Sequence, residues 1–387
     1  MDYPYGTPRG HEVPAGPLSA PVVRATSHAM PDAETILAYS SGSKSGDFYP
    51  RYGHSNGISW ESLVATQERA EGAVAFGSGM AAVHAAMWAH LRAGDRILVQ
   101  EQVYGGTEGI VLHELPRCGV VVDRFDALLA GALERGLEKR PKLVMLESPI
   151  NPTLRLVDLA AAALACKKAG AISVVDGTFA PPPLQHALEL GIDLVVHSAT
   201  KYYGGHSDVM AGVVAGRHAL LAEVARYRGR TGAILAPDLA WLLCRSHPTL
   251  KLRVDAQVKN AEQLARALEA QMRQDSRLRA VAYPGLPSHP DHALCKRQMR
   301  GGGALVTITV AGGLEAARRT FDRFLVIARG PSLGGVESLG SIPRFTTHAR
   351  VPPEVLVRNG IDDGMIRISV GLEEPERLLG DVLQALS

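Results

Sequence analysis

Short apolar runs that end in turn-forming residues recur along the first two thirds of the chain. One of them, Leu194–Val196, is followed by small polar residues, Lys201 and two glycines, before another apolar run begins at Val209. Apolar runs this short, bounded by turn residues, predict buried strands. The same pattern predicts strands at 95–100, 119–125 and 142–147, a strand that ends at Asp176, and a short strand before the turn Gly77–Gly79.

Helical patterns separate these predicted strands. An amphipathic pattern predicts a helix at 61–71, an alanine-rich stretch predicts one from about Met80, and a third is predicted at about 156–169. Alternating strands and helices are typical of a mostly parallel sheet covered on both faces, and such sheets bind ligands at the carboxyl ends of their strands. We therefore predict an α/β fold with its site at that edge.

The two ends of the chain have different patterns. Residues 1–60 show little periodicity and many turn formers, so they cannot bury a core of their own and are expected either to stay mobile or to pack on another surface. The pattern at 236–275 is helical, interrupted by Pro248, and 304–387 mixes predicted strands, including 324–328, with helices. We expect an N-terminal arm (1–60), a large domain (61–245), and a linking helix with a small α+β domain (246–387).

Composition narrows the class of protein. The chain has 387 residues, of which 46% are hydrophobic and 21% charged, and its formal charge of +2 has no block of one sign. These values indicate a globular protein and favour neither a nucleic-acid partner nor a membrane. Widely spaced cysteines predict no disulfide framework or zinc site and suit a reduced, cytoplasmic compartment. A lone His206–Asp208 pair lacks further ligands, so we expect no metal.

Lys201 and Asp176 are the candidate chemical groups. A lysine on a tight turn can simply lie at the surface, but Asp176 closes a second predicted strand earlier in the chain. A lysine and a carboxylate at neighbouring strand ends suit pyridoxal 5′-phosphate (PLP). The lysine forms a Schiff base with the aldehyde, and the acid keeps the ring nitrogen protonated so that the ring can accept electrons.

The segments that carry these two residues, SATKYYGGHSD (198–208) and VVDGTFAPP (174–182), are similar to the Cys/Met-metabolism family of PLP enzymes. That family contains cystathionine γ-synthases, cystathionine γ-lyases and methionine γ-lyases. The resemblance extends from about Tyr49 to Leu386. It implies PLP fold type I, the aspartate aminotransferase-like fold, with PLP as the cofactor and an amino acid as the substrate.

The resemblance also implies roles for individual residues. In the cofactor site, Lys201 and Tyr104 are the catalytic residues, and Tyr104 also stacks on the ring. The other cofactor-binding residues are Gly79, Met80, Asn151, Asp176, Thr178, Ser198 and Thr200, joined by Tyr49 and Arg51 of a neighbouring subunit. A glycine-rich turn before a helix suits a phosphate.

Ser332 and Arg367 are expected to bind the substrate carboxylate. Arg367 lies in the apolar run MIRISV, where an arginine is costly without an anion, although a structural salt bridge is the alternative explanation. The family further implies a homotetramer built from dimers that share their active sites.

Three departures from the family leave the substrate open. The usual GLKTL segment is Ser246–Leu250, the usual GNPT is Gly53–Asn56, and Gly106 stands where methionine γ-lyases usually have cysteine. PSLGGVESL and VGLEE look most like the γ-synthase and γ-lyase branch, so we predict γ-elimination or γ-replacement on a homoserine-ester or cystathionine-like substrate. The alternatives are a β-eliminating lyase, a specialised biosynthetic enzyme that uses another nucleophile, and a catalytically silent PLP-binding protein.

Overall fold

The structure, a computed structural model, describes residues 18–44, 46–349 and 351–386. Its larger sheet has seven strands in the order β1-β7-β6-β5-β4-β2-β3. Only β7 runs antiparallel to its neighbours, and the other pairs are parallel. The mostly parallel α/β fold is therefore confirmed. The strands are β1 (Gly72–Phe76), β2 (Arg96–Gln100), β3 (Val121–Phe125), β4 (Leu143–Glu147), β5 (Ile172–Asp176), β6 (Leu194–His197) and β7 (Gly212–Gly216).

Helices cover both faces of this sheet because its strands are apolar on both sides. One face packs against α3 (Gly79–Trp88), the turns η1 (Ile110–Glu114) and α5 (Leu115–Arg117) and α8 (His218–Thr231). The other face packs against α2 (Ser55–Glu68), α6 (Ala132–Leu137), α7 (Leu159–Ala169) and α9 (Pro237–Ser246). Glu147, Asp176 and His197 end three adjacent strands, so their side chains start from the same edge.

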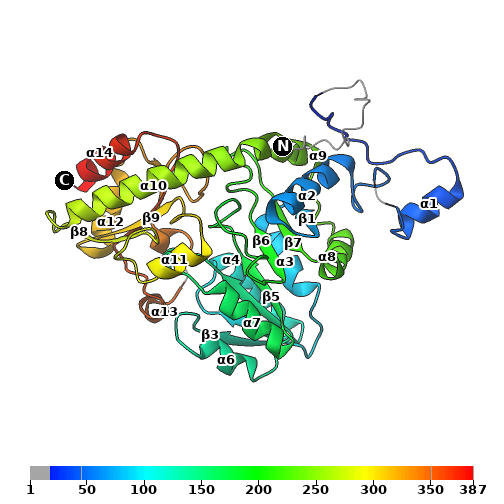
Figure 1. Cartoon of the computed structure of the whole chain (residues 1–387), viewed down its shortest axis with the longest axis horizontal. Helices are drawn as coiled ribbons and strands as arrows, with labels where there is room; N and C mark the ends of the chain where they lie inside the picture. The colour runs from blue at the N-terminus through cyan, green and yellow to red at the C-terminus, as the bar shows by residue number, and fades with distance from the viewer. Residues whose placement is uncertain (1–17, 45, 350, 387) are drawn as a thin grey trace.

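A second sheet of five strands, in the order β10-β11-β12-β9-β8, forms the smaller half of the molecule. Its core is shared with α10, α12 and α14. Figure 1 shows α10 running along the top of the molecule from α9 to this smaller half. The elements are α10 (Leu250–Met272), β8 (Leu278–Ala282), α11 (His292–Gln298), β9 (Leu305–Val310), α12 (Gly313–Asp322), β10 (Ala328–Arg329), β11 (Leu339–Ser341), α13 (Pro353–Arg358), β12 (Met365–Ser369) and α14 (Pro375–Leu386), with short helices η2 (His247–Thr249) and η3 (Pro343–Phe345).

The described part of the arm contacts the body through an Arg24–Asp238 ion pair and through the Trp241 indole, which donates to the Ala20 carbonyl. Its helix α1 (Ala33–Ser40) has no buried residue and projects away from the rest of the molecule in Figure 1. Residues 1–17 of the predicted arm lie outside the described residues. Nearer the body, Asn56 of α2 accepts from the Val23 N–H and donates to the Pro21 carbonyl.

Two sequence predictions need correction. The helix expected at 61–71 begins at Ser55, because the His54 side chain caps its N-terminus by accepting from the Gly57 N–H. It ends at Glu68, where Arg69 adopts a left-handed conformation. The strand expected at 324–328 is reduced to Ala328–Arg329, because the N–H groups of residues 325–327 donate to the Asp381 carboxylate and not to a neighbouring strand.

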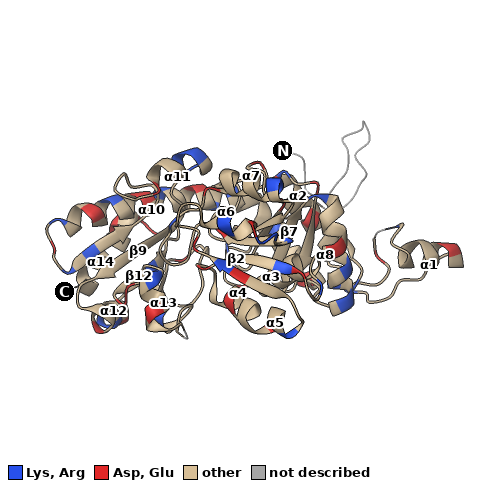
Figure 2. Cartoon of the chain, turned by 90° about the horizontal axis from the view of Figure 1, so that it is seen from below, with Lys and Arg blue, Asp and Glu red and all other residues tan. Residues whose placement is uncertain are grey.

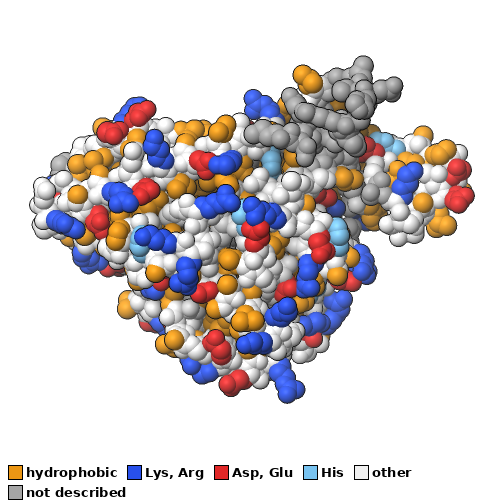
Figure 3. Space-filling model, viewed as in Figure 1, with side chains coloured by type: hydrophobic (Ala, Val, Ile, Leu, Met, Phe, Trp, Pro, Cys, Tyr) orange, Lys and Arg blue, Asp and Glu red, His pale blue; other side chains and the backbone are white. Residues whose placement is uncertain are grey.

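Charges of both signs are interspersed on the surface of the two halves (Figures 2 and 3). Among the described residues, none of the helices has both the length and the apolar content needed to span a bilayer. Those residues also contain no group of three or more His, Cys, Asp or Glu side chains arranged to hold a metal ion.

Candidate active site

A cavity of about 230 Å³ lies at the carboxyl edge of the large sheet. Residues far apart in the sequence meet there, from the starts of α3 and α4 (Gly105–Gly109), the ends of β4, β5 and β6, and the loops before β11 and after η3. The lining residues that the sequence singled out are Gly79, Met80, Tyr104, Asn151, Asp176, Thr178, Ser198, Thr200, Lys201 and Arg367, and Glu147 lies among them. The fold therefore brings the predicted lysine, carboxylate and arginine into one cavity.

Lys201 lies on the turn after β6, with its ammonium group inside the cavity. Its Nζ donates to Ser332 Oγ at 2.9 Å, and it forms no ion pair within the described residues. Burial, with a smaller contribution from Arg367, lowers the pKa of Lys201 to about 8. A lysine with this pKa is partly neutral near physiological pH, so it can act as a nucleophile and as a base.

Asp176 and Glu147 lie opposite each other on the paired strands β5 and β4. Burial raises the pKa of both carboxyl groups, and the charge of Asp176 adds to the rise for Glu147. Thr178 opposes this for Asp176, because its N–H and its hydroxyl both donate to Asp176 Oδ1, at 3.0 and 2.5 Å. No described residue donates to Asp176 Oδ2, which leaves one carboxylate oxygen free for a ligand.

Glu147 organises the two residues expected beside the cofactor ring. Its Oε2 accepts from the Tyr104 N–H at 2.6 Å, and its Oε1 accepts from the Asn151 N–H at 3.2 Å. The Gln100 side chain holds the Glu147 backbone on both sides, donating to its carbonyl and accepting from its N–H. One carboxylate thus fixes the start of α4, where Tyr104 is located, relative to the turn that carries Asn151.

The part of the cavity lined by the start of α3 is suited to receive an anion. Helix α3 starts there, with Ser78 as its N-cap accepting from the Ala81 N–H, and the N–H groups of Gly79 and Met80 have no partner among the described residues. A Cβ added to Gly79 would lie 2.7 Å from Ser198 Oγ, so only glycine lets this hydroxyl and the helix start come so close. Free N–H groups at a helix start, beside a hydroxyl, are a typical phosphate site.

Arg367 is 3% exposed and lies in the middle of β12. One Nη donates to Asn151 Oδ1 at 2.8 Å, the other donates weakly to the Ser332 carbonyl at 3.4 Å, and the buried Nε has no partner. Burial lowers its pKa to about 10, and no carboxylate lies within ion-pair distance among the described residues. No described carboxylate forms the structural salt bridge with Arg367 that was the alternative explanation. The guanidinium of Arg367 can therefore still bind an anionic ligand.

Some neighbours in the cavity were not recognised from the sequence. Phe179 lies under the guanidinium of Arg367, with 5.5 Å between Cζ and the ring centre, and Thr347 and Met210 complete the wall. Phe179 belongs to the quoted segment VVDGTFAPP, so its spacing after Asp176 was an available signal. Thr347 follows η3 in the smaller half, and nothing in its local sequence indicates a site.

The two substituted segments do not line this cavity. His54 caps α2 and contacts the Leu235 carbonyl, and Asn56 holds the arm. In the other segment, Ser246 Oγ donates to the Gly204 carbonyl at 2.5 Å, and His247 stacks on Tyr203. In this chain, both substituted segments therefore make local structural contacts and are not part of the cavity lining.

Tyr49 and Arg51 also lie outside the cavity of their own chain. Arg51 donates to the Gly229 carbonyl at 2.9 Å and lies over the rings of Tyr49 and Tyr52. Tyr49 is 41% exposed. Their predicted role in binding the cofactor of a neighbouring subunit stays a prediction.

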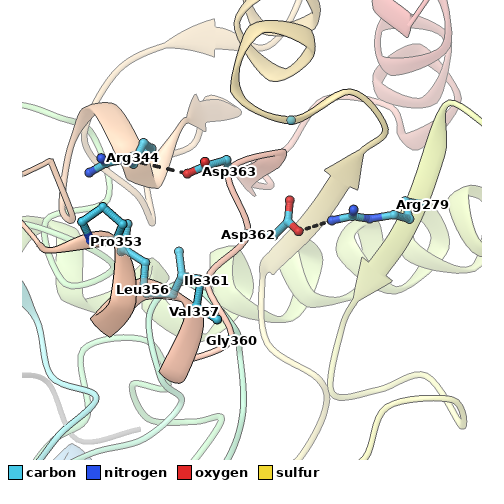
Figure 4. A pocket seen from close by; sticks show the side chains of 10 residues that line it. Arg279, Arg344, Pro353, Leu356, Val357, Gly360, Ile361, Asp362 and Asp363 are labelled. Atoms are coloured by element: carbon cyan, nitrogen blue, oxygen red, sulfur yellow. Dashed lines mark hydrogen bonds and ion pairs between the residues drawn. The ribbon is translucent and has the colours of Figure 1, made fainter.

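A larger groove, of about 500 Å³, lies on the smaller half of the molecule, and its charged side chains differ from those of the first cavity in being paired with each other. Its charged side chains are paired, Arg279 with Asp362 and Arg344 with Asp363, while Leu356 and Val357 supply apolar side chains beside them (Figure 4). It contains no lysine, and its two arginines are already neutralised. We therefore place the candidate chemistry in the smaller cavity.

The smaller cavity fits PLP. It offers an amine of lowered pKa for the aldehyde, a free carboxylate oxygen for the ring nitrogen, and a glycine-dependent anion site for the phosphate. With the mostly parallel seven-stranded sheet, these residues define a PLP-dependent enzyme of fold type I. The cofactor prediction and the predicted fold are confirmed.

Comparisons with known proteins identify the family. The sequence profile of the Cys/Met metabolism PLP-dependent enzymes matches residues 8–387, and the chain belongs to this family. It is 40% identical to an L-methionine γ-lyase of Pseudomonas deceptionensis over 376 residues, 96% of this chain and 93% of that protein. It is 37% identical to a cystathionine γ-lyase of Bacillus subtilis over 372 residues, 96% of this chain and 94% of that protein.

A solved structure of a related enzyme has the same fold. A cystathionine γ-synthase from Xanthomonas oryzae pv. oryzae, crystallised in complex with aminoacrylate and cysteine, superimposes with a TM-score of 0.90 at 34% identity. The match covers 97% of this chain and 94% of that chain. The expectation of a PLP-dependent lyase or transferase of the transsulfuration type is thereby confirmed.

Proposed function

We propose that this enzyme carries out γ-elimination or γ-replacement on a homoserine-ester or cystathionine-like amino acid. The observation that carries the proposal is the placement of Arg367, without an ion-pair partner, in the same cavity as the Lys201 amine. A carboxylate held by Arg367 and Ser332 fixes one end of an α-amino acid, and Lys201 Nζ is then close to the carbon that carries the amino group.

The site geometry and the family support the following cofactor roles. The N–H groups of Gly79 and Met80 and the hydroxyls of Ser198 and Thr200 hold the phosphate. Asp176, itself fixed by Thr178, binds the ring nitrogen. Asn151 lies beside the ring hydroxyl, and Tyr104 stacks on the ring.

When bound, PLP supplies the electron withdrawal that makes the carbons of the substrate acidic. The residues of the chain position the substrate and move protons. The pKa of Lys201 is about 8, so its Nζ can accept the proton from the substrate Cα. The same Nζ then transfers protons between the carbons of the substrate side chain. Tyr104, which is 40% exposed at the mouth of the cavity, is the second candidate for proton exchange with the substrate.

Two alternatives use the same residues. A β-eliminating cystathionine or cysteine lyase needs the same lysine, carboxylate and arginine. The substituted segments leave open a specialised biosynthetic enzyme that adds another nucleophile, since His247 and His54 occupy positions where relatives usually carry other residues. Gly106 argues mildly against methionine γ-lyase activity, because the usual cysteine is absent.

Product analysis of the purified protein tests the proposal. A γ-reaction on a homoserine ester, cystathionine or methionine gives 2-oxobutyrate when no nucleophile is added, whereas a β-reaction on cystathionine or cysteine gives pyruvate. We expect 2-oxobutyrate to exceed pyruvate, and a replacement product to form at its expense when a thiol is added. Pyruvate as the main product would establish β-chemistry instead.

We further propose a homotetramer, built from dimers with shared active sites, that works in the cytoplasm. The isolated position of α1 and the distance of Tyr49 and Arg51 from their own cavity support sharing. The four cysteines are all free, which supports a reducing compartment. We retain the division into an arm (1–60), a large domain (61–245) and a linking helix with a small domain (246–387) as part of this proposal.

A further inference from the structure

Residues 246–253, where α9 ends and α10 begins, hold the backbone that follows Lys201. Each of the next three residues of the turn has a contact with this junction. The contacts are Arg253 Nη1 with the Tyr202 carbonyl at 2.8 Å, the His247 ring with the Tyr203 ring, and Ser246 Oγ with the Gly204 carbonyl at 2.5 Å. None of the three junction residues lines the cavity, so their route to the reacting groups is through this turn.

Arg253 joins the start of α10 to the turn. It is 6% exposed and forms no ion pair within the described residues. Besides the Tyr202 carbonyl, its guanidinium donates to Ser246 Oγ and to Thr249 Oγ1, both at 3.1 Å. A buried cation whose partners are dipoles is costly unless its donors have fixed acceptors. The Ser246 hydroxyl is one of these acceptors and is also a donor to the turn, so a single side chain connects both.

The turn has little room to move between its neighbours. Gly205 has a φ of +71°, and a Cβ added to it would overlap the Arg253 guanidinium. On another side, a Cβ added to Gly334 would lie 2.8 Å from the Tyr202 nitrogen. Gly334 belongs to the loop that also supplies the hydrogen-bond partner of Lys201 Nζ. Close packing of this kind transmits a displacement to the next segment and does not absorb it.

The bond from Ser246 ties the Gly204 carbonyl to a separate element. His206 Nδ1 also lies 2.7 Å from this carbonyl, but His206 belongs to the same turn and moves with it. Ser246 is the last residue of α9. Removing its hydroxyl therefore leaves the carbonyl with a partner and the turn without this tie to α9. The hydroxyl is a feature of this chain, because the usual GLKTL segment has glycine at this position.

We propose that Ser246 is a positioning residue for Lys201: with Arg253 it fixes the carbonyls of the turn, and thereby the point from which the lysine side chain extends into the cavity. This inference rests on the proposed role of Lys201 as the residue that bonds to the aldehyde of PLP. In that step Nζ forms a C=N bond with the aldehyde carbon, the C=O bond breaks, and the oxygen leaves as water with the two hydrogens of the amine. The step depends on the place of Nζ, whereas the phosphate and ring contacts do not involve Nζ.

The test compares the affinities of the full-length apoprotein for PLP and for 4′-deoxypyridoxine 5′-phosphate, in which a methyl group replaces the aldehyde. Both ligands can make the phosphate and ring contacts, but only PLP can bond to Lys201. We expect Ser246→Ala to lower the preference for PLP by about tenfold, since a misplacement of about an ångström is costly for a reacting group. The affinity for the analogue should change much less. Equal weakening of both ligands, or no change in either, would show that Ser246 has a structural role only.

Ser173→Ala is the matched control. Ser173 is 0% exposed, and its hydroxyl donates to the Asp193 carboxylate at 2.9 Å, but it lies near the start of β5, away from the carboxyl edge. Its replacement should leave the preference unchanged even where it lowers the melting temperature. An equal fall in preference with Ser173→Ala would contradict the proposal, since any buried serine would then have the same effect.

A second variant covers the case in which the Ser246→Ala protein does not fold. Ser246→Cys keeps a donor of similar shape, but a thiol donates only weakly. It should therefore show a smaller fall in the preference for PLP, and an unchanged preference would contradict the proposal.

Lys201→Ala separates the two levels of the argument. If it abolishes the preference while Ser246→Ala retains it, Lys201 has its proposed role and Ser246 does not position it. If Lys201→Ala also retains the preference, the proposed bond between Lys201 and the aldehyde is itself wrong.

Discussion

At the scale of single residues, the site concentrates ionisable side chains in a buried space and leaves their charges incompletely paired. Lys201 has a hydroxyl as its hydrogen-bond partner, and Arg367 has an amide oxygen and a carbonyl. Such an arrangement lowers stability, because buried cations are paired with dipoles instead of anions. It is consistent with a site whose missing anions arrive with the cofactor and the substrate.

Replacing Arg367 with lysine should strongly impair turnover. Arg367→Lys keeps the positive charge but loses the planar, two-pronged donor, so it should not behave as a conservative change. We expect kcat/KM to fall by about 30- to 5000-fold, which corresponds to ~2–5 kcal/mol for the loss of a buried charged contact. PLP content should stay nearly unchanged, as Arg367 is not expected to touch the phosphate. Wild-type turnover, or loss of PLP, would contradict the carboxylate assignment.

Burial of Lys201 should make the stability of the apoprotein depend on pH. Its pKa falls from an ordinary 10.5 to about 8, so the unfolded state binds more protons between these values, and stability rises with pH across that window. The penalty is fully present below about pH 8 and is gone above about pH 10.5. Lys201→Met apoprotein should therefore melt at a higher temperature than wild-type apoprotein at neutral pH.

Melting temperatures of the two apoproteins, measured at about pH 7 and about pH 9.5, check this expectation. The difference between the two melting temperatures should become smaller at the higher pH. Other groups that titrate in this range affect both proteins alike. A difference that is constant with pH would indicate that Lys201 is not desolvated in the folded protein.

At the scale of elements, the site depends on the close approach of the start of α3 to the end of β6. Gly79 and Ser198 are the contacting residues, and Gly212 contributes a second close approach, since a Cβ there would lie 2.2 Å from the Ser78 carbonyl oxygen. These glycines let the helix dipole and a hydroxyl act on the same anion.

Gly79→Ala should weaken cofactor binding more than it weakens the fold. The added methyl, 2.7 Å from Ser198 Oγ, has to push the two segments apart. We expect the affinity for PLP, measured by titration of the apoprotein, to fall by about tenfold or more, as displacements of about an ångström are costly at a preorganised site. The control Gly380→Ala, in α14 with open space around it, should stabilise the protein by roughly 0.5–1 kcal/mol and leave PLP affinity unchanged. Equal effects of both changes on PLP affinity would exclude this role for Gly79.

At the scale of the whole molecule, one chain encloses most of the candidate cofactor site but leaves α1 of its arm exposed. Helix α1 exposes Ile36 and Leu37 and buries no residue of its own. Tyr49 and Arg51 are expected to complete the phosphate site of another subunit.

Complementation between inactive variants tests this sharing. Mixing Arg51→Ala with Lys201→Ala protein, with exchange of subunits, should restore about a quarter of the wild-type activity. Half of randomly mixed dimers are hybrids, and each hybrid has one site with both native residues. Neither variant alone should be active to this extent. Hybrids that form, as shown by a mass tag on one variant, yet have no activity would argue against shared sites.

The sequence by itself determined the strand–helix alternation and the family, and it singled out Lys201 and Asp176 as candidate chemical groups. These features are local: strands and turns follow from short apolar runs and glycines, and chemically active side chains follow directly after strands. Boundaries were less accurate where a side-chain contact decides them. The His54 cap sets the start of α2 at Ser55, and the Asp381 carboxylate, which accepts from the N–H groups of residues 325–327, limits a predicted strand to Ala328–Arg329.

Only the tertiary structure decided which residues surround the active ones. The pairing of β4 with β5 places Glu147 beside Asp176, and the end of α2 brings Glu68 to His197, although these residues are far apart in the chain. No local pattern encodes such contacts, because they depend on strand order and on how helices pack over the sheet. For the same reason, the sequence did not show that Arg367 Nε has no partner or that the pKa of Lys201 is lowered. Both follow from burial, which is a property of the folded chain.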